Sequence, residues 1–306
     1  MTQTYRPLAA AGWMTGAIAS FTAMAIAGRQ VSNVHDTFEI MAARSVIGLV
    51  LVLLVGAALR RLNRIRTDRM AQHIVRNLFH FTGQNLWFYA ITMIPLAQVF
   101  ALEFTSPIWV ILLSPLVLGE RLTRMRLISA GLGFAGILIV ARPDFAALNP
   151  GVLAAAGSAV FFAATILMTK ALTRGEDIVS ILFWLTLMQA VLGAVIAGHD
   201  GQIAWPTPAT LPWLALIGVA GVIAHLCLTT ALSLAPASFV VPMDFVRLPV
   251  IAAVGAWVYA EPADLAVFAG GALIFLGNWL NIRAQGNPAS GDTTHARKSQ
   301  SSFTEL

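Results

Sequence analysis

The chain is a succession of apolar runs, each about as long as a membrane is thick. About ten such runs follow one another, separated by charged or Pro/Gly-rich segments. A helix needs ~20 apolar residues to cross the hydrocarbon core of a bilayer. Of the 306 residues, 58% are hydrophobic and only 11% are charged, whereas soluble domains contain ~25% charged residues. The sequence therefore predicts an all-α membrane protein with about ten transmembrane helices.

The predicted helices divide into two groups of five. The first group covers 8–27, 38–59, 72–93, 95–118 and 125–141, and the second covers 151–172, 178–197, 211–234, 236–259 and 264–282. The first run has no convincing small-residue cleavage site, so we expect a membrane helix and no cleaved signal peptide. Residues 284–306 are polar and rich in Gly, Ser and Thr, and predict a disordered cytoplasmic tail.

Basic residues indicate the orientation. With the N-terminus in the cytoplasm, 14 arginines and lysines fall in cytoplasmic segments and only Arg29 and Arg142 fall outside. The densest group is the run from Arg60 to Arg69. Such a bias follows the positive-inside rule. We expect a multi-pass protein of the bacterial inner membrane with both termini in the cytoplasm.

A shift of 141 residues superimposes landmarks of the two halves without a gap. The pairs include Arg29 with Lys170, Glu103 with Asp244, Glu120 with Glu261, Pro95 with Pro236, and Phe21 with Phe162. Each half holds an odd number of helices, so the second half enters the membrane from the opposite side. The expected domains are 8–142 and 151–283, two inverted repeats typical of transporters that work by alternating access.

Two short motifs resemble a known family. The segment Leu118-Gly119-Glu120-Arg121-Leu122-Thr123 precedes a glycine-rich helix, and Tyr259-Ala260-Glu261-Pro262 is its degenerate second copy. This looks like the closing signature of an EamA-type transporter of the drug/metabolite transporter superfamily. The resemblance implies ten helices, two repeats and a central cavity formed by 8–27, 72–93, 95–118, 151–172, 211–234 and 236–259. Family members carry amino acids, nucleosides and vitamins, and some import riboflavin or S-adenosylmethionine.

Prolines mark one pair of repeat-related helices. Pro107 and Pro115 lie within 95–118, and Pro242 and Pro249 lie within 236–259. A proline in a helix leaves a backbone carbonyl without its partner and bends the helix. Interrupted helices at matching positions of two repeats point to a transport site. We expect Pro107, Pro242 and Pro249 to act as hinges, although prolines are also common in membrane helices.

The same two helices contain the deepest charges. Glu103 and Asp244 each lie about 8 residues into a helix, or ~12 Å at 1.5 Å per residue. Arg247 follows Asp244 by three residues, which places both on one helix face. A charge at this depth costs at least ~2.5–3.5 kcal/mol unless it is paired or hydrated. These residues are either a substrate site or a structural ion pair, and a pair that faces a cavity serves both purposes.

Three further residues are candidates for substrate contact. Gln84 and Trp87 lie three apart in 72–93, so an amide and an aromatic ring share a face that suits a planar, hydrogen-bonding solute. Arg44 resembles an arginine found in this helix of the family, and we expect it to contact substrate, to snorkel outward, or to pair with Glu39 or Glu103. Arg76 and His80 are expected to anchor or gate, and His225 and Gln189 are secondary candidates.

The predicted function is secondary transport of a small polar or amphipathic metabolite such as an amino acid, a nucleoside-like compound or riboflavin. Interior acids allow coupling to a proton or ion, and facilitated diffusion is equally compatible. The six histidines are scattered and no cofactor-binding motif is present, so no metal and no cofactor is expected. The run from Arg60 to Arg69 is short and juxtamembrane, so no nucleic acid partner is expected. A monomer suffices and a homodimer is not excluded. The alternatives are a membrane scaffold or receptor and, with less support, a lipid-modifying enzyme.

Overall fold

The computed structural model describes residues 6–66, 68–118, 124–141, 149–198, 201–235, 240, 243–244, 247–261 and 264–285. In this part of the chain every regular element is helical, so the all-α prediction is confirmed. The first half contains α1 (Pro7–Val31), α2 (Thr37–Ala58), the 3₁₀ helix η1 (Leu62–Arg64), α3 (Met70–Met93), α4 (Leu96–Glu103), α5 (Ser106–Leu118) and α6 (Arg124–Ala141). The second half contains α7 (Pro150–Leu172), α8 (Ile178–Ile196), α9 (Leu211–Leu234), α11 (Arg247–Tyr259) and α12 (Leu265–Gln285).

Five of the described helices, α1, α2, α7, α8 and α9, are long and apolar enough to cross a membrane. Helix α3 is also long, with 24 residues, but it buries polar side chains such as Arg76, His80 and Gln84. Polar residues in a membrane helix face a cavity or a partner because lipid cannot solvate them. The composition of α3 therefore places it at the centre of the bundle.

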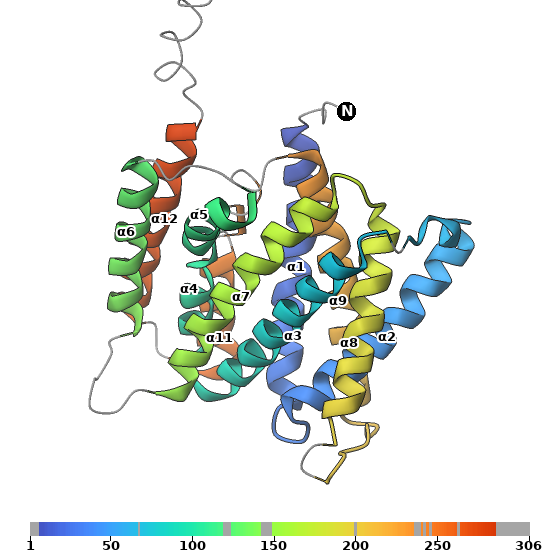
Figure 1. Ribbon diagram of the computed structural model, residues 1–306. Coiled ribbons are helices and arrows are strands. Elements are labelled where there is room, and N and C mark those ends of the chain that lie inside the picture. Colours follow the sequence, from blue (N-terminus) through green and yellow to red (C-terminus); the bar gives the residue numbers. More distant parts are fainter. Residues whose placement is uncertain are drawn as a thin grey trace, which may run out of the picture.

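The helices pack in pairs that join the two halves of the chain. Helix α1 packs on α9, α3 on α7, α2 on α8, and α6 on α12 (Figure 1). The 141-residue shift relates α1 to α7 and α3 to α9, so the first two contacts are one arrangement seen twice. The last two contacts join a helix to its own repeat mate. This is the pattern of two repeats related by a pseudo-two-fold axis, and the predicted inverted five-helix repeats are confirmed.

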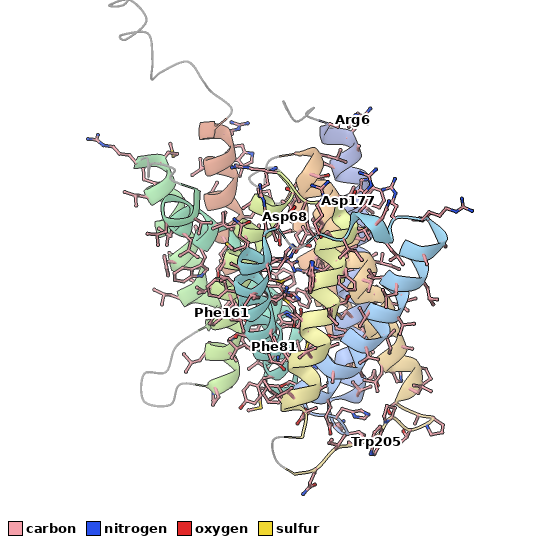
Figure 2. The ribbon with its side chains drawn as sticks, turned by 45° about the vertical axis from the view of Figure 1, so that its right-hand side comes forward. Arg6, Asp68, Phe81, Phe161, Asp177 and Trp205 are labelled. Atoms are coloured by element: carbon pink, nitrogen blue, oxygen red, sulfur yellow. The ribbon has the colours of Figure 1, made fainter. Side chains whose placement is uncertain are left out.

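The connections alternate between two faces of the bundle. Arg6, Asp68 and Asp177, at the start of α1 and in the α2–α3 and α7–α8 connections, lie toward one end, which we call the Arg6 face (Figure 2). Trp205, in the α8–α9 connection, lies toward the other end, the Trp205 face. Helix α12 ends on the Arg6 face. The described connections thus alternate as an even number of membrane crossings requires.

Two predicted helices differ from the observed ones. The predicted helix 95–118 is broken into α4 and α5, and within the predicted helix 236–259 the described long helix, α11, begins only at Arg247. Pro249 lies near the start of α11 as described, and its role as a hinge stays a prediction. Pro242 lies outside the described residues.

The boundary of the predicted tail also shifts. Helix α12 continues through Gln285, two residues into the segment 284–306 that was expected to be disordered. Its last turn carries Arg283, and a cation there interacts favourably with the helix dipole. Residues 286–306 lie outside the described part of the chain.

Candidate functional site

The break between α4 and α5 positions Glu103 at the end of a short helix. Pro107 has no N–H, so the carbonyl of Glu103, four residues earlier, loses its normal helical partner. The hydroxyl of Ser106 donates to this carbonyl instead. The hydroxyl of Thr105 donates to the carbonyl of Leu102 at 2.8 Å. The local sequence thus interrupts the helix and satisfies the freed backbone groups without water.

Glu103 joins the two repeats through its carboxylate. One oxygen accepts a hydrogen bond from Arg247 Nη2 at 2.7 Å, and the other accepts one from Trp87 Nε1 at 2.8 Å. The same Arg247 nitrogen also donates to Asp244. Both of the ion pairs that the sequence left open are therefore present, Glu103 with Arg247 and Asp244 with Arg247.

The charge of this centre is not balanced among the described residues. Two carboxylates contact one guanidinium, and Asp244 Oδ1 and Arg247 Nε are buried without a hydrogen-bond partner. The side chains of Glu103 and Asp244 are 14% and 19% exposed, against 2% for Arg247. The carboxylates thus remain partly accessible and keep capacity for a cation or a proton.

Aromatic rings surround the guanidinium of Arg247. Its Cζ lies 4.6 Å from the ring centre of Phe100, 5.1 Å from that of Phe21 and 5.6 Å from that of Phe104. An arginine over the face of an aromatic ring within ~6 Å is attracted by the ring quadrupole. These contacts hold Arg247 in place where water is scarce.

The charged centre lies in the wall of a cavity between the repeats. Its lining comes from α1, α3, the α4–α5 break, α7, α9 and the segment that leads into α11. These are the six helices that the family resemblance implies. The cavity has about 90 Å³ of space for the centres of water-sized spheres. Since ~10–15 Å³ of such space holds one water molecule, the cavity accommodates several.

Most of the cavity wall is apolar or aromatic. Rings come from Phe21, Trp87, Phe104 and Phe162, and the polar side chains in the wall expose little of their surface to the cavity. A mostly apolar wall with a few well-placed polar groups is the general form of a small-molecule site. The arrangement can bind a solute by stacking and orient it by a small number of hydrogen bonds.

The structure brings together most of the residues singled out from the sequence. The cavity is lined by Gln84, Trp87, Glu103, Asp244, Arg247 and Pro107. Arg44 does not line it: its side chain borders a second, small cavity between α2, α8 and α9. Neither Glu39 nor Glu103 forms an ion pair with Arg44 in the described structure, because Glu39 contacts His35 and Glu103 contacts Arg247.

Several residues that line the cavity were not among the main candidates predicted from the sequence. Phe162 and Thr165 of α7 face the cavity opposite α3, and His80 and His225 stand in its wall with ring centres 4.7 Å apart. Phe162 is the repeat mate of Phe21, which also lines the cavity, so the repeat itself contained a signal for both. The contact between His80 and His225 depends on how α3 and α9 pack, which no local pattern specifies.

A charged contact closes the bundle near the Trp205 face. Arg29, at the end of α1, forms an ion pair with Glu261, which follows α11. Arg29 also donates to the carbonyls of Ile91 and Ile94 at the end of α3, at 2.7 Å each. Glu261 in turn accepts from the backbone N–H of Leu96 at the start of α4. Four helices are thereby tied together at one end of the cavity.

Comparison with known proteins identifies the family. A family model described as EamA-like transporter family matches residues 8–142 and 149–283. The chain belongs to the EamA-like transporter family. It is a multi-pass membrane protein of the drug/metabolite transporter superfamily.

Relatives within the EamA-like family have named substrates. A riboflavin transporter of Brucella anthropi is 34% identical over 230 residues, which cover 74% of this chain and 80% of that protein. A riboflavin transporter of Vibrio cholerae is 29% identical and covers 90% of this chain and 93% of its own length. An S-adenosylmethionine uptake transporter of Rickettsia felis is 24% identical, with 86% and 88% covered. These similarities make the chain a transporter of small metabolites.

The EamA fold is also found in a solved structure. One crystal structure superimposes with a TM-score of 0.67 at 20% identity, and the alignment covers 90% of this chain and 97% of the other. At this low sequence identity the match supports a shared fold and nothing more. It agrees with the paired helices of the two repeats.

Proposed function

We propose that the protein carries a planar heteroaromatic metabolite, riboflavin first among candidates, across the bacterial inner membrane by alternating access. The observation that carries the proposal is the cavity between the repeats, whose aromatic wall includes Phe21, Trp87 and Phe162. A flat ring system stacks on such side chains and gains favourable contact beyond simple burial. Two of the relatives are named riboflavin transporters, and riboflavin belongs to this class of solute.

The polar groups of the cavity fit hydrogen bonding to such a solute. The side chain of Gln84 lines the cavity and can both donate and accept, and the hydroxyls of Ser106 and Thr165 stand in the same wall. The isoalloxazine ring of riboflavin carries carbonyl oxygens and ring nitrogens along one edge, and its side chain carries hydroxyls. A few convergent polar groups are enough to orient it.

The second candidate is S-adenosylmethionine. The observation that favours it is the surplus of carboxylates at the charged centre, Glu103 and Asp244 against Arg247. A sulfonium or ammonium group of the solute would balance that surplus. If the solute is riboflavin, which is uncharged, the same surplus serves a coupling proton or cation.

Uptake into proteoliposomes tests the proposal. The purified protein, reconstituted into lipid vesicles, is expected to accumulate radiolabelled riboflavin above protein-free vesicles, and excess unlabelled riboflavin should compete. Glu103→Gln should abolish most of this uptake, whereas the control Asp68→Asn, an exposed carboxylate on the Arg6 face, should leave it unchanged. Uptake of labelled S-adenosylmethionine alone would favour the second candidate. Failure of both solutes would point to another metabolite or to a scaffold.

A further inference from the structure

A second group of buried polar side chains lies beside the central cavity and has no part in the charged centre. We call Arg44 of α2, Arg76 and His80 of α3, and His225 of α9 the basic cluster. Their exposed fractions are 5%, 1%, 2% and 5%. Arg44 and His225 line the same small cavity, the rings of His225 and His80 are 4.7 Å apart, and Arg76 lies one turn before His80 on α3. The four basic side chains therefore form one continuous group in the interior.

The basic cluster is short of hydrogen-bond acceptors. Arg76 Nε donates to the hydroxyl of Thr169 at 2.7 Å, but Arg76 Nη1 is buried without a partner. Arg44 Nε, both ring nitrogens of His80 and Nε2 of His225 are buried and unpartnered as well. Buried donors are almost always satisfied in native structures. A neutral imidazole carries one donor and one acceptor nitrogen, so the unsatisfied donors are Arg44 Nε, Arg76 Nη1 and at least one nitrogen of His80. These donors indicate that a ligand completes the cluster.

No described carboxylate neutralises the two arginines. Glu39 is bound by the backbone N–H groups of Asp36 and Ala204 and lies near His35. Glu103 is bound by Arg247 and Trp87. Glu176 lies 4.0 Å from His73, one turn before Arg76, and forms no ion pair with either arginine. An unpaired charge in a low-dielectric interior is unfavourable unless an ion of opposite sign accompanies it.

The geometry leaves a place for such an ion. Arg44 passes over Gly221, where a Cβ would lie 2.6 Å from Nε, and His225 is one turn further along α9. Arg44 and His225 line the small second cavity, which has about 10 Å³ for the centres of water-sized spheres. That is about the space for one water-sized group. His225 also lines the central cavity, so this side chain lies between the two spaces.

We propose that the basic cluster binds a singly charged anionic group in the wall of the central cavity. The ligand is either a small inorganic anion such as chloride or the carboxylate of a transported solute. Both sources offer one negative charge and several acceptor lone pairs to Arg44 and His225, which line the small cavity. His80 contacts the ring of His225, and Arg76 lies one turn before His80 on α3. The inference stands on these contacts and does not depend on which metabolite is transported.

Anion-dependent thermal stability of the purified protein tests the proposal. The melting temperature is measured in sodium HEPES, with sodium chloride or sodium acetate replacing HEPES at constant ionic strength. At least one of the two anions should raise the melting temperature by several degrees in a saturable manner, because a ligand that binds the folded state stabilises it. A response to chloride identifies an inorganic anion, and a response to acetate alone identifies a carboxylate.

Matched variants locate the effect. Arg44→Gln should abolish the anion response, while Arg61→Gln, which removes an exposed arginine, should retain it. In sodium HEPES alone Arg44→Gln should be at least as stable as the natural protein, because an unpaired buried charge is gone. The proposal is overturned if neither anion stabilises the natural protein, or if the response persists in Arg44→Gln.

A second measurement covers the case in which Arg44→Gln does not fold. Crystals of the natural protein soaked in sodium bromide should show an anomalous peak in contact with Arg44 and His225. Such a peak supports the site independently of any variant. Crystals that diffract well and show no peak there, together with no acetate response, would overturn the proposal.

Discussion

Arg29 and Lys170 make the same contacts one repeat apart. Arg29 donates to the carbonyls of Ile91 and Ile94, and Lys170 donates to those of Leu232 and Ala235, at 2.8 and 3.3 Å. Every one of these residues is displaced by 141 from its counterpart. Arg29 tethers helix ends on the Trp205 face and Lys170 tethers them on the Arg6 face. The inverted repeat thus places one latch at each end of the cavity.

The latch on the Trp205 face predicts the effect of Glu261→Gln. Loss of a charged hydrogen bond, worth ~1.5–3 kcal/mol, should open this face ~10- to 100-fold more often. The measurement is the rate at which a membrane-impermeant thiol reagent, added on the Trp205 face, labels Ser106→Cys in a Cys227→Ser background. Asp68→Asn, which removes an exposed carboxylate on the Arg6 face, is the control. Equal labelling rates in Glu261→Gln and the control would contradict the latch.

More of the fold than of the candidate site could be predicted from the sequence. Helix α9 begins and ends with the apolar run, at Leu211 and Leu234, because an apolar run long enough to span a bilayer can be recognised from the local sequence alone. The α4–α5 break was not predicted as a break, although Pro107 marked the place. Contact between Glu103 and Arg247, 144 residues apart, was one of several pairings that the sequence left open, since only tertiary packing chooses among them.

The surroundings of the Arg44 side chain could not be predicted from its position in α2. Its place in α2 gave no indication that the helix would turn this side chain toward Gly221 on α9 and away from the central cavity. Glycine leaves room there for the guanidinium, so the decisive residue belongs to a different helix. By contrast, Gln84 and Trp87 share a face by helical spacing alone, and both line the cavity.

Trp87→Phe is predicted to weaken transport without unfolding the protein. The ring that lines the cavity is largely kept, but the donor to Glu103 at 2.8 Å is lost. A hydrogen bond to a charged group is worth ~1.5–3 kcal/mol, so a loss that is carried into solute binding raises the KM by ~10- to 100-fold. Trp109→Phe is the matched control, because Trp109 packs edge-to-face against Phe134 and does not line the cavity. A KM unchanged in Trp87→Phe would remove Trp87 from the site.

Arg247→Ala is predicted to destabilise the protein through the carboxylates it leaves behind. Removal of one partner of a buried ion pair costs ~3–5 kcal/mol. Titration with denaturing detergent should show a matching loss of stability. Adding Glu103→Gln and Asp244→Asn to this variant should restore much of the stability but not transport, because the repulsion is gone and the site is not rebuilt. A triple variant as unstable as Arg247→Ala would contradict this explanation.

Close helix contacts predict where small residues are required. A Cβ on Gly193 of α8 would lie 2.8 Å from the Cα of Ala42 on α2, whereas a Cβ on Gly12 would meet nothing within 4 Å. Gly193→Val should therefore force α2 and α8 apart and cost ~1–3 kcal/mol. Gly12→Ala should be neutral or slightly stabilising, since alanine favours helix by ~1 kcal/mol over glycine. Thermal unfolding in detergent compares the two, and equal melting temperatures would contradict the packing argument.

The most direct test of the central claim is equilibrium binding of riboflavin to the purified protein, followed by the flavin's own fluorescence. Stacking of the flavin ring in the cavity should quench its fluorescence saturably, and this quenching should be strongly reduced in Trp87→Ala and in Glu103→Gln but retained in Trp109→Phe. Quenching that does not saturate, or that is unchanged in Trp87→Ala and Glu103→Gln while these variants remain folded, would contradict the claim that the cavity between the repeats is the site where this solute binds.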